Sequence, residues 1–283
     1  MKSTSSLLLL LYLVLAPFVQ AQAPTTIKLN LVSDGVFTVH ATIAGHEGTF
    51  LFDSGAGISN ISPDFAASIK CRPWGQITGF RMTGQRLDMP RCDHVAFTLA
   101  GRSFPASTVG VIDMTKFLPS EVGHIDGTIA LDLLANQVFT LSYAGHFIRI
   151  LDRNALSQTV KGLHSMPVHV VRDAEGLAVA VNLPVSTSAG TAWFEMDSGN
   201  GSGLVVVNKA LAPLFDLTEG KDLPVSLSLE DGTTFIGPAR VLDLILDGNL
   251  GASFLSRHDV TIDLPHHKAW VSPETRPAKQ NRP

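Results

Sequence analysis

The sequence has little charge and little cysteine, and both shortages exclude classes of function. Charged residues make up 16% of the chain and the formal net charge is −4, so there is no basic surface of the kind that nucleic-acid binding requires. The two cysteines, Cys71 and Cys92, have no nearby cysteine partners and make a poor metal site. We therefore expect neither a nucleic-acid partner nor a bound metal.

Long apolar runs are scarce as well. The one run, Leu7 to Ala16, follows Lys2 and precedes Val19-Gln20-Ala21, which is the pattern of an export signal with a small-residue cleavage site. Residues 1–21 are predicted to be a signal peptide, and an uncleaved anchor is the alternative. Because no comparable run follows, we expect a periplasmic or secreted protein with no stable membrane insertion after cleavage.

Two further kinds of catalytic site lack their sequence patterns. No two of the ten histidines lie at helical ligand spacing beside a glutamate, and His266 and His267 fall in a predicted hairpin turn. The run from Gly199 to Gly203 superficially fits a serine-hydrolase elbow, but the strand–turn–helix setting of that elbow is absent. Structural or surface roles are expected for these residues.

The sequence does contain a carboxylate-bearing turn that occurs twice. Asp53-Ser54-Gly55 follows the apolar run Phe50-Leu51-Phe52, and 144 residues later Asp197-Ser198-Gly199 follows Phe194-Glu195-Met196. Glycine lets backbone amides approach the carboxylate, and the serine hydroxyl can hold it by hydrogen bonding. Two carboxyls in one site do not both ionise easily, so they hold one proton between them.

A second repeat accompanies the first. Asp126 to Leu134 matches Asp247 to Leu255 without a gap at an offset of 121 residues, and the strand patterns that follow run on to Ile150 and Val271 at the same offset. Two matches in the same order indicate that the chain consists of two related halves.

The first turn resembles the Asp-Ser-Gly-Ala active-site turn of retroviral-type aspartic proteases, and the pair resembles the two-lobed arrangement of pepsin-like enzymes. The resemblance implies an all-β, two-lobed pepsin-like acid protease fold, built from two retropepsin-like β-barrel repeats with short helices. It also implies that Asp53 and Asp197 are catalytic, in active-site turns supported by Ser54, Gly55, Ser198 and Gly199.

The Asp-Gly repeat resembles the hydrophobic-hydrophobic-Gly element that lies behind the active-site turn in this family. Leu250-Gly251 fits that pattern, whereas Ala130 stands where the first copy should have glycine. The extra methyl group is expected either to be absorbed or to shift the turn that it supports.

Periodicity and turn residues divide the chain into lobes. We predict an N-terminal lobe over residues 22–155, a C-terminal lobe over 156–273 and a disordered tail over 274–283, with a polar linker from Asp152 to Ser165. In the first lobe, strands are expected at residues 27–31, 36–43 and 48–52, and a short helix at 62–69 with Ser62 as N-cap. In the second lobe, a short helix is expected at residues 208–214, and a hairpin with strands at 225–229 and 233–236.

Three smaller features concern the site. Residues 76–85 are predicted to form a mobile hairpin over a cleft, with Gly79, Phe80, Met82 and Gly84 as flap residues, and a plain surface loop is the alternative. In an oxidising compartment, Cys71 and Cys92 are expected to form a disulfide. Glu195 lies two residues before Asp197 and faces the same side of its strand; an exposed edge position is expected, and a third carboxylate near the pair is the alternative.

The sequence therefore predicts an aspartic endopeptidase in which a water molecule is activated between Asp53 and Asp197, with a peptide or protein substrate and no cofactor or metal. The alternative is a catalytically inactive peptide-binding protein of the same fold. A dimer of first lobes is disfavoured because the second lobe already supplies the partner carboxylate, so we expect a monomer.

Overall fold

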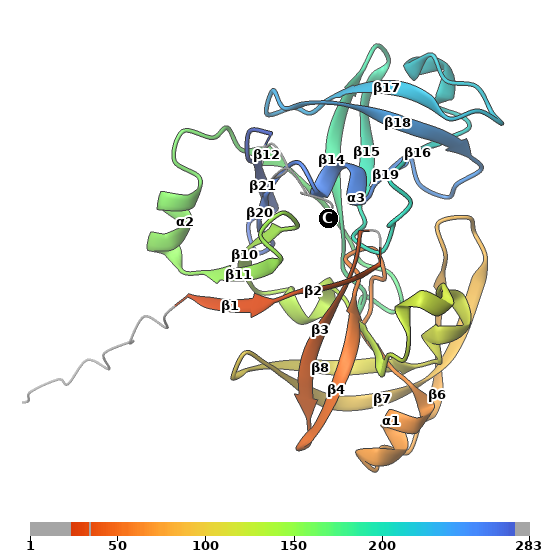
Figure 1. Cartoon of the computed structure of the whole chain (residues 1–283), viewed down its shortest axis with the longest axis vertical. Coiled ribbons are helices and arrows are strands. Elements are labelled where there is room, and N and C mark those ends of the chain that lie inside the picture. The colour runs from red at the N-terminus through yellow and green to blue at the C-terminus, as the bar shows by residue number, and fades with distance from the viewer. Residues whose placement is uncertain (1–23, 34, 275–283) are drawn as a thin grey trace, which may run out of the picture.

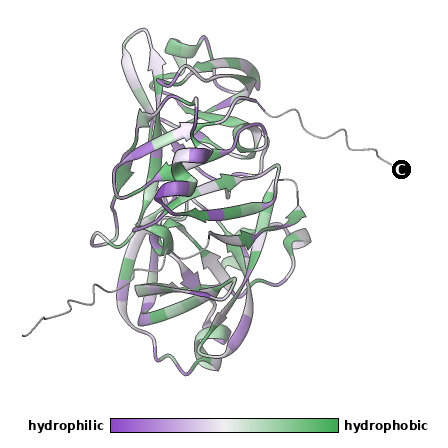
Figure 2. Ribbon diagram, turned by 90° about the vertical axis from the view of Figure 1, so that its left-hand side faces the viewer, coloured by the Kyte–Doolittle hydropathy of each residue, from purple (hydrophilic) through white to green (hydrophobic). Residues whose placement is uncertain are grey.

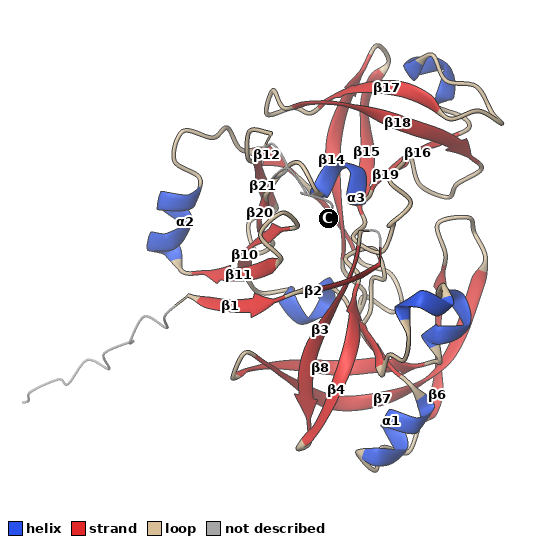
Figure 3. Ribbon diagram, in the orientation of Figure 1, coloured by secondary structure: helices blue, strands red, loops and turns tan. Residues whose placement is uncertain are grey.

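The computed structural model describes residues 24–33 and 35–274, and strands predominate throughout (Figures 1 and 3). The all-β expectation is confirmed. The predicted signal peptide and nearly all of the predicted tail lie outside the described residues. Among the described residues, no helix is long and apolar enough to cross a membrane.

The first lobe is one twisted sheet of eight strands, ordered β2-β3-β4-β9-β5-β8-β7-β6. Its strands alternate buried and exposed side chains over much of their length, and Figure 2 shows the resulting mixture of hydrophobic and hydrophilic positions. The bounds are β2 (Asn30–Ser33), β3 (Val36–Ile43), β4 (His46–Phe52), β5 (Asn60–Ile61), β6 (Trp74–Phe80), β7 (Arg86–Leu99), β8 (Arg102–Val111) and β9 (Gly127–Ile129).

The second lobe repeats this plan in a seven-stranded sheet, ordered β13-β14-β15-β19-β16-β18-β17. In each lobe the strand that leads to the Asp-Ser-Gly turn lies parallel to the short strand of the Asp-Gly repeat, β4 beside β9 and β15 beside β19. The bounds are β13 (His169–Val171), β14 (Ala180–Thr187), β15 (Gly190–Met196), β16 (Val205–Asn208), β17 (Leu223–Ser228), β18 (Thr234–Leu242) and β19 (Gly248–Leu250).

A third sheet of six strands, ordered β1-β11-β10-β20-β21-β12, joins the lobes (Figure 1). Its central strands β10 and β20 belong to equivalent hairpins of the two halves. Thr140 pairs with Thr261, and their hydroxyl oxygens lie 2.8 Å apart. The halves are therefore related by an approximate two-fold axis through this pair. The bounds are β1 (Thr25–Lys28), β10 (Val138–Ser142), β11 (Phe147–Leu151), β12 (Met166–Pro167), β20 (Val260–Asp263) and β21 (Lys268–Val271).

The helices are short. Helix α1 begins as predicted, because the Ser62 hydroxyl accepts a hydrogen bond from the Phe65 backbone N–H and Pro63 occupies the first turn. The α-helices are α1 (Pro63–Ser68), α2 (Arg153–Thr159) and α3 (Ala252–Leu255), and the 3-10 helices are η1 (Met114–Phe117), η2 (Ser120–Val122), η3 (Leu131–Leu134) and η4 (Ala212–Phe215).

The structure corrects three local predictions. The strand expected at residues 27–31 is two strands in different sheets, because β1 pairs with β11, a pairing that the bond from the Leu29 N–H to the His146 carbonyl extends, whereas β2 pairs with β3. The helix expected at 208–214 is the shorter η4, because the Asn208 side chain is held at the end of β16 by the Leu244 and Leu246 carbonyls. The linker contains α2, which the Asp152 carboxylate caps, and the predicted lobe boundary falls inside this helix.

The predicted flap is a hairpin. Strands β6 and β7 pair in antiparallel register up to Phe80 and Arg86, so the surface-loop alternative is wrong for the backbone. A disulfide joins Cys71 to Cys92 with a Cα–Cα distance of 6.3 Å. Because Cys92 lies in β7, this disulfide ties the segment after α1 to the base of the hairpin.

Candidate active site

Asp53 and Asp197 follow β4 and β15 at equivalent places in the two lobes. The Asp53 N–H donates to the Ile129 carbonyl and the Asp197 N–H to the Leu250 carbonyl, each at 3.0 Å, so the short parallel strand behind each turn fixes its carboxylate. Both aspartates are half-buried. The structure thus brings together two residues that lie 144 positions apart in the chain.

The two serines interlock the turns. The Ser54 hydroxyl donates to the Met196 carbonyl at 2.7 Å and accepts from the Ser198 N–H at 2.9 Å. Reciprocally, the Ser198 hydroxyl donates to the Phe52 carbonyl at 3.2 Å and accepts from the Ser54 N–H at 2.8 Å. Both serines are fully buried, so these four bonds satisfy groups that water does not reach.

The glycines allow each carboxylate to lie against the opposite turn. A Cβ atom on Gly55 would lie 2.6 Å from the Asp197 Cγ, and one on Gly199 would lie 2.5 Å from the Asp53 Cγ. A side chain at either position would therefore collide with the aspartate of the opposite turn. Each glycine N–H also donates to the aspartate of its own turn, at 2.9 Å for Gly55 and 2.8 Å for Gly199.

The Asp-Gly repeat supports the strands that lead into the turns. The Asp126 carboxylate accepts from the Thr49 N–H at 2.8 Å, and the Asp247 carboxylate accepts from the Trp193 N–H at 2.9 Å. Thr49 and Trp193 each lie four residues before the aspartate of their lobe. The second repeat in the sequence therefore reflects the same support built twice.

The pKa of Asp53 depends on its burial and on the neighbouring carboxyl group. Burial, and next the charge of Asp197, raise the pKa of Asp53 well above its ordinary value, while the N–H groups of Gly55 and Gly199 act in the opposite direction. Tyr143 packs beside the pair and donates its phenolic proton to the Ser198 carbonyl at 2.6 Å. Burial raises the pKa of Tyr143, so the phenol stays protonated.

An amide network in the second lobe was not predicted. The Asn249 Nδ2 donates to the Asp197 Oδ2 at 2.7 Å, and the Asn249 Oδ1 accepts from the Asn200 Nδ2 at 2.8 Å. The signal was present in the sequence, because Asn249 occupies an apolar position of the hydrophobic-hydrophobic-Gly element. Its significance depends on a contact with Asp197 that sequence reasoning did not consider.

The expectation that Glu195 is exposed at an edge was wrong. Glu195 is 9% exposed, because β15 lies between β14 and β19 and Glu195 pairs with residues of both. Burial first, and then the charges of Asp197 and Asp53, raise the pKa of Glu195 well above its ordinary value, although a hydrogen bond with Asn249 opposes this. Glu195 is thus a third carboxyl group beside the pair.

The alanine at position 130 is accommodated. Ala130 has an extended backbone with φ −113°, which an alanine adopts without strain, and its N–H donates to the Ser59 hydroxyl at 3.0 Å. In the second lobe, a Cβ atom on Gly251 would lie 2.4 Å from the Asn200 carbonyl oxygen. Glycine is therefore required where Asn200 packs and is dispensable in the first lobe, where Ala56 takes the equivalent position.

The flap hairpin contacts both lobes. Midway along the hairpin, Ile77 and Met89 cluster with Ile58, which follows the Asp53-Ser54-Gly55 turn. At its tip, the Met82 carbonyl accepts a hydrogen bond from the Ile245 N–H at 2.9 Å. Gly79 and Phe80 lie at the end of β6 and Gly84 in the turn, and Phe80 is 59% exposed. The turn of the hairpin therefore reaches the second lobe.

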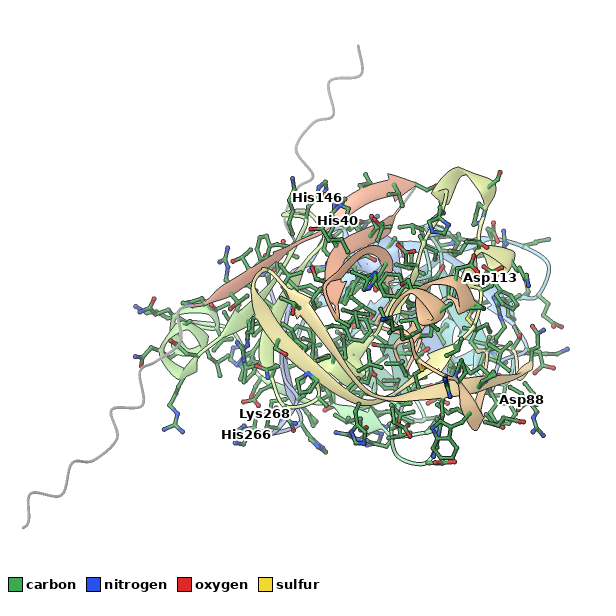
Figure 4. All side chains as sticks on the ribbon, turned by 90° about the horizontal axis from the view of Figure 1, so that it is seen from below. His40, Asp88, Asp113, His146, His266 and Lys268 are labelled. Atoms are coloured by element: carbon green, nitrogen blue, oxygen red, sulfur yellow. A yellow bond between two sulfur atoms is a disulfide. The ribbon has the colours of Figure 1, made fainter. Side chains whose placement is uncertain are left out.

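The titratable residues labelled in Figure 4 lie toward the periphery of the view, and His266 and Lys268 belong to the same β20–β21 hairpin. Among the described residues, no group of three or more histidine, cysteine, aspartate or glutamate side chains is arranged to hold a metal ion. His266 lies in the turn between β20 and β21, with its Nδ1 2.8 Å from Asp263.

Comparison with known proteins identifies the fold. No protein-family model matches the sequence, and no curated protein matches it. Many solved structures resemble the chain, and two of them illustrate the likeness. Basic 7S globulin from soybean has a TM-score of 0.56 and 11% identity, covering 88% of this chain and 94% of the globulin. Conglutin gamma, a basic 7S globulin from lupine seeds, has a TM-score of 0.57 and 10% identity, covering 89% of this chain and 95% of that one. Both have the pepsin-like fold, and the predicted fold class is thereby confirmed.

Proposed function

We propose that this protein is an aspartic endopeptidase, a hydrolase that cleaves peptide bonds with Asp53 and Asp197. The observation that carries the proposal is the reciprocal packing of two half-buried carboxylates against the glycines of the opposite turns. Such a pair shares one proton and offers a base and an acid at the same place. The substrate is a peptide or protein, the active form is a monomer, and neither a metal nor a cofactor takes part.

In the proposed reaction one carboxylate removes a proton from a bound water, whose oxygen attacks the scissile carbonyl carbon. The protonated carboxyl group gives its proton to the carbonyl oxygen as charge develops there. The flap hairpin covers the bound peptide and excludes water, with Phe80 and Met82 as substrate contacts. The protein acts after export, in the periplasm or outside the cell, where the disulfide between Cys71 and Cys92 is stable.

A peptide-binding protein of the same fold is the second candidate, and the structural comparisons favour it over the enzyme. The two structures described above are named as basic 7S globulins, not as proteases. In this alternative the paired turns hold the lobes together and an extended peptide binds beneath the flap without being cut. The retention of both Asp-Ser-Gly turns with their interlocking serines supports the enzyme.

One experiment separates the two candidates. Purified mature protein is incubated with a peptide library from pH 3 to pH 8, with and without a transition-state-mimicking aspartic protease inhibitor, and the products are identified by mass spectrometry. We expect cleavage with a bell-shaped dependence on pH that the inhibitor abolishes. Peptide binding without cleavage at every pH would refute the enzyme and support the binding protein.

A further inference from the structure

We propose that Asn249 is a positioning residue that keeps Asp197 ionised, so that the proton shared by the pair rests on Asp53. This inference rests on the proposed function and deepens it, because it assigns the base to the second lobe and the acid to the first. The assignment depends on side chains that differ between the two lobes.

The two aspartates accept hydrogen bonds from different sets of donors. The Asp197 Oδ1 accepts from the Gly199 N–H at 2.8 Å and the Asn200 N–H at 3.2 Å, and its Oδ2 accepts from the Asn249 amide at 2.7 Å. Asp53 has the backbone N–H groups of Gly55 and Gly199, and its side-chain partner is Asp197 itself. Hydrogen-bond donors on both oxygens of a carboxylate favour its charged form.

The orientation of the Asn249 amide is set by its surroundings. The Ser202 hydroxyl donates to the Asn200 Oδ1 at 2.6 Å, the Asn200 Nδ2 donates to the Asn249 Oδ1, and the Asn249 Nδ2 donates to Asp197. Every donor in this chain points toward the carboxylate, and the reverse orientation would place an amide oxygen against it. Asn249 is fully buried, so water does not compete for these bonds.

The described residues of the first lobe contain no equivalent of this series of hydrogen bonds. Thr128 occupies the position of Asn249, and its hydroxyl is a buried atom without a hydrogen-bond partner among the described residues. Ala56 replaces Asn200, and Leu51 replaces Glu195 in an apolar cluster with Val122 and Ile125. Asp53 therefore receives no side-chain amide that would favour its charge.

The other titratable groups near Asp197 do not reverse the assignment. They are Asp53 on the opposite turn, Glu195 on β15 and Tyr143 after β10. Burial raises the pKa of Tyr143 and the pKa of Glu195, which favours their neutral forms, and among the described residues no lysine, arginine or histidine forms an ion pair with either aspartate. The local charge balance is thus decided within the pair and by the donors around it.

The assignment gives each atom of the reaction a destination. An O–H bond of the water breaks and its proton moves to Asp197, while the water oxygen bonds to the carbonyl carbon. The proton of Asp53 moves to the carbonyl oxygen, which yields a neutral tetrahedral diol. Collapse of the diol returns a proton to Asp53 as the C–N bond breaks and the amine leaves with the proton held by Asp197.

The first test compares kcat/KM against pH for the wild type, Asn249→Leu and Thr128→Val. Asn249→Leu removes the donor with similar side-chain volume, and we expect the acid limb of the profile to move upward by about one pH unit, a tenfold change in proton affinity. Thr128→Val changes the equivalent residue of the first lobe and is expected to leave the limb in place. An unchanged acid limb in folded Asn249→Leu would overturn the proposal. Should that variant not fold, Asn200→Ala is expected to move the limb in the same direction by a smaller amount.

The second test does not depend on turnover, so it distinguishes failure of this inference from failure of the proposed function. Carboxyl carbon NMR of the wild-type protein follows both aspartates as the pH is lowered, with signals assigned from Asp53→Asn and Asp197→Asn. We expect Asp53 to take up the first proton and Asp197 the second. Uptake in the reverse order would overturn the assignment even in an active enzyme, and the expected order in a protein that cleaves nothing would refute only the enzyme.

Discussion

The two lobes use the same backbone to hold their aspartates and different side chains to surround them. Both have the Ser-Gly turn, the interlocking hydroxyl and the supporting Asp-Gly segment. They differ at four equivalent positions near the carboxylates, where the first lobe has Leu51, Ala56, Thr128 and Ala130 and the second has Glu195, Asn200, Asn249 and Gly251.

This comparison teaches that geometry and electrostatics come from separate sets of residues. The shared residues bring the carboxylates together and give each one the N–H of the glycine in its own turn, so they do not distinguish the two aspartates. The differing residues form an apolar environment on one side and an amide network on the other, and these give the two carboxyl groups unequal partners. An approximately symmetric fold can therefore hold a chemically asymmetric pair.

The largest effect is expected at the aspartates, where the difference between the lobes should disappear. Asp53→Asn and Asp197→Asn should each lower kcat by about 1,000-fold or more, because either change removes the shared proton and charge. The double variant should be little worse than either single one. Steady-state kinetics checks this, with circular dichroism as the control for folding. Equal cleavage by wild type and Asp197→Asn would rule out the catalytic pair.

The two interlocking serines should contribute equally to the stability of the protein. Ser54→Ala leaves the buried Ser198 N–H and Met196 carbonyl without their partner, and we expect a loss of about 2–4 kcal/mol in the free energy of unfolding. Ser198→Ala should cost a similar amount, and the double variant should cost less than the sum because the bonds are shared.

Urea unfolding measures these changes, and the exposed Ser226→Ala in β17 is the matched control. A loss near zero for both buried variants would show that the interlock does not stabilise the protein.

The glycine of the second lobe should be the more sensitive of the equivalent pair. Gly251→Ala places a methyl group 2.4 Å from a backbone oxygen, so the turn after Asp197 must shift at a cost of about 1–3 kcal/mol. Ala130→Gly adds backbone freedom to the unfolded state, which costs about 0.5–1 kcal/mol, and removes a buried methyl group worth about 0.8 kcal/mol. Thermal unfolding of the two variants gives the comparison. A larger loss for Ala130→Gly would contradict our account of the alanine.

The smallest effect concerns Asp132, whose equivalent in the second lobe is Ser253. Burial raises the pKa of Asp132 from 3.8 to about 6, although the Ser59 hydroxyl bonds to its carboxylate. The folded protein thus holds this proton more tightly than the unfolded chain, and stability falls as the pH rises from about 3.8 through about 6.

A pKa shift of this size corresponds to about 3 kcal/mol of stability, and solvent around the half-buried carboxyl group screens part of it. Asp132→Asn should therefore reduce the fall in stability by up to about 2 kcal/mol. Chemical unfolding at several pH values measures the slope, and Ser253→Ala should leave it unchanged. A slope in Asp132→Asn identical to that of the wild type would show that another group is responsible.

Much of the fold was predictable from local pattern. The Ser62 cap, the β6–β7 hairpin and the hairpin of β17 and β18 depend on turn chemistry and alternation, which are properties of neighbouring residues. The separation of β1 from β2 at Leu29 and the short length of the helix after Asn208 depend on partners far away in the chain. The local pattern therefore misassigned both segments.

The prediction that Glu195 is exposed was wrong for a related reason. A charged residue in a strand is usually exposed, and its burial here follows from the position of β15 between two other strands. The order of strands in a sheet is set by contacts across the whole lobe, and no short window of sequence contains it.

The sequence by itself determined the repeated turns, the all-β class and the pairing of Asp53 with Asp197, because a duplicated motif is visible without any knowledge of distance. Only the tertiary structure decided what surrounds each carboxylate. Asn249 reaches Asp197 because β19 lies parallel to β15, and this proximity comes from the packing of strands that are 52 residues apart at the contact. Hydrogen bonds and burial act through space, so the asymmetry of the pair is a property of the folded molecule.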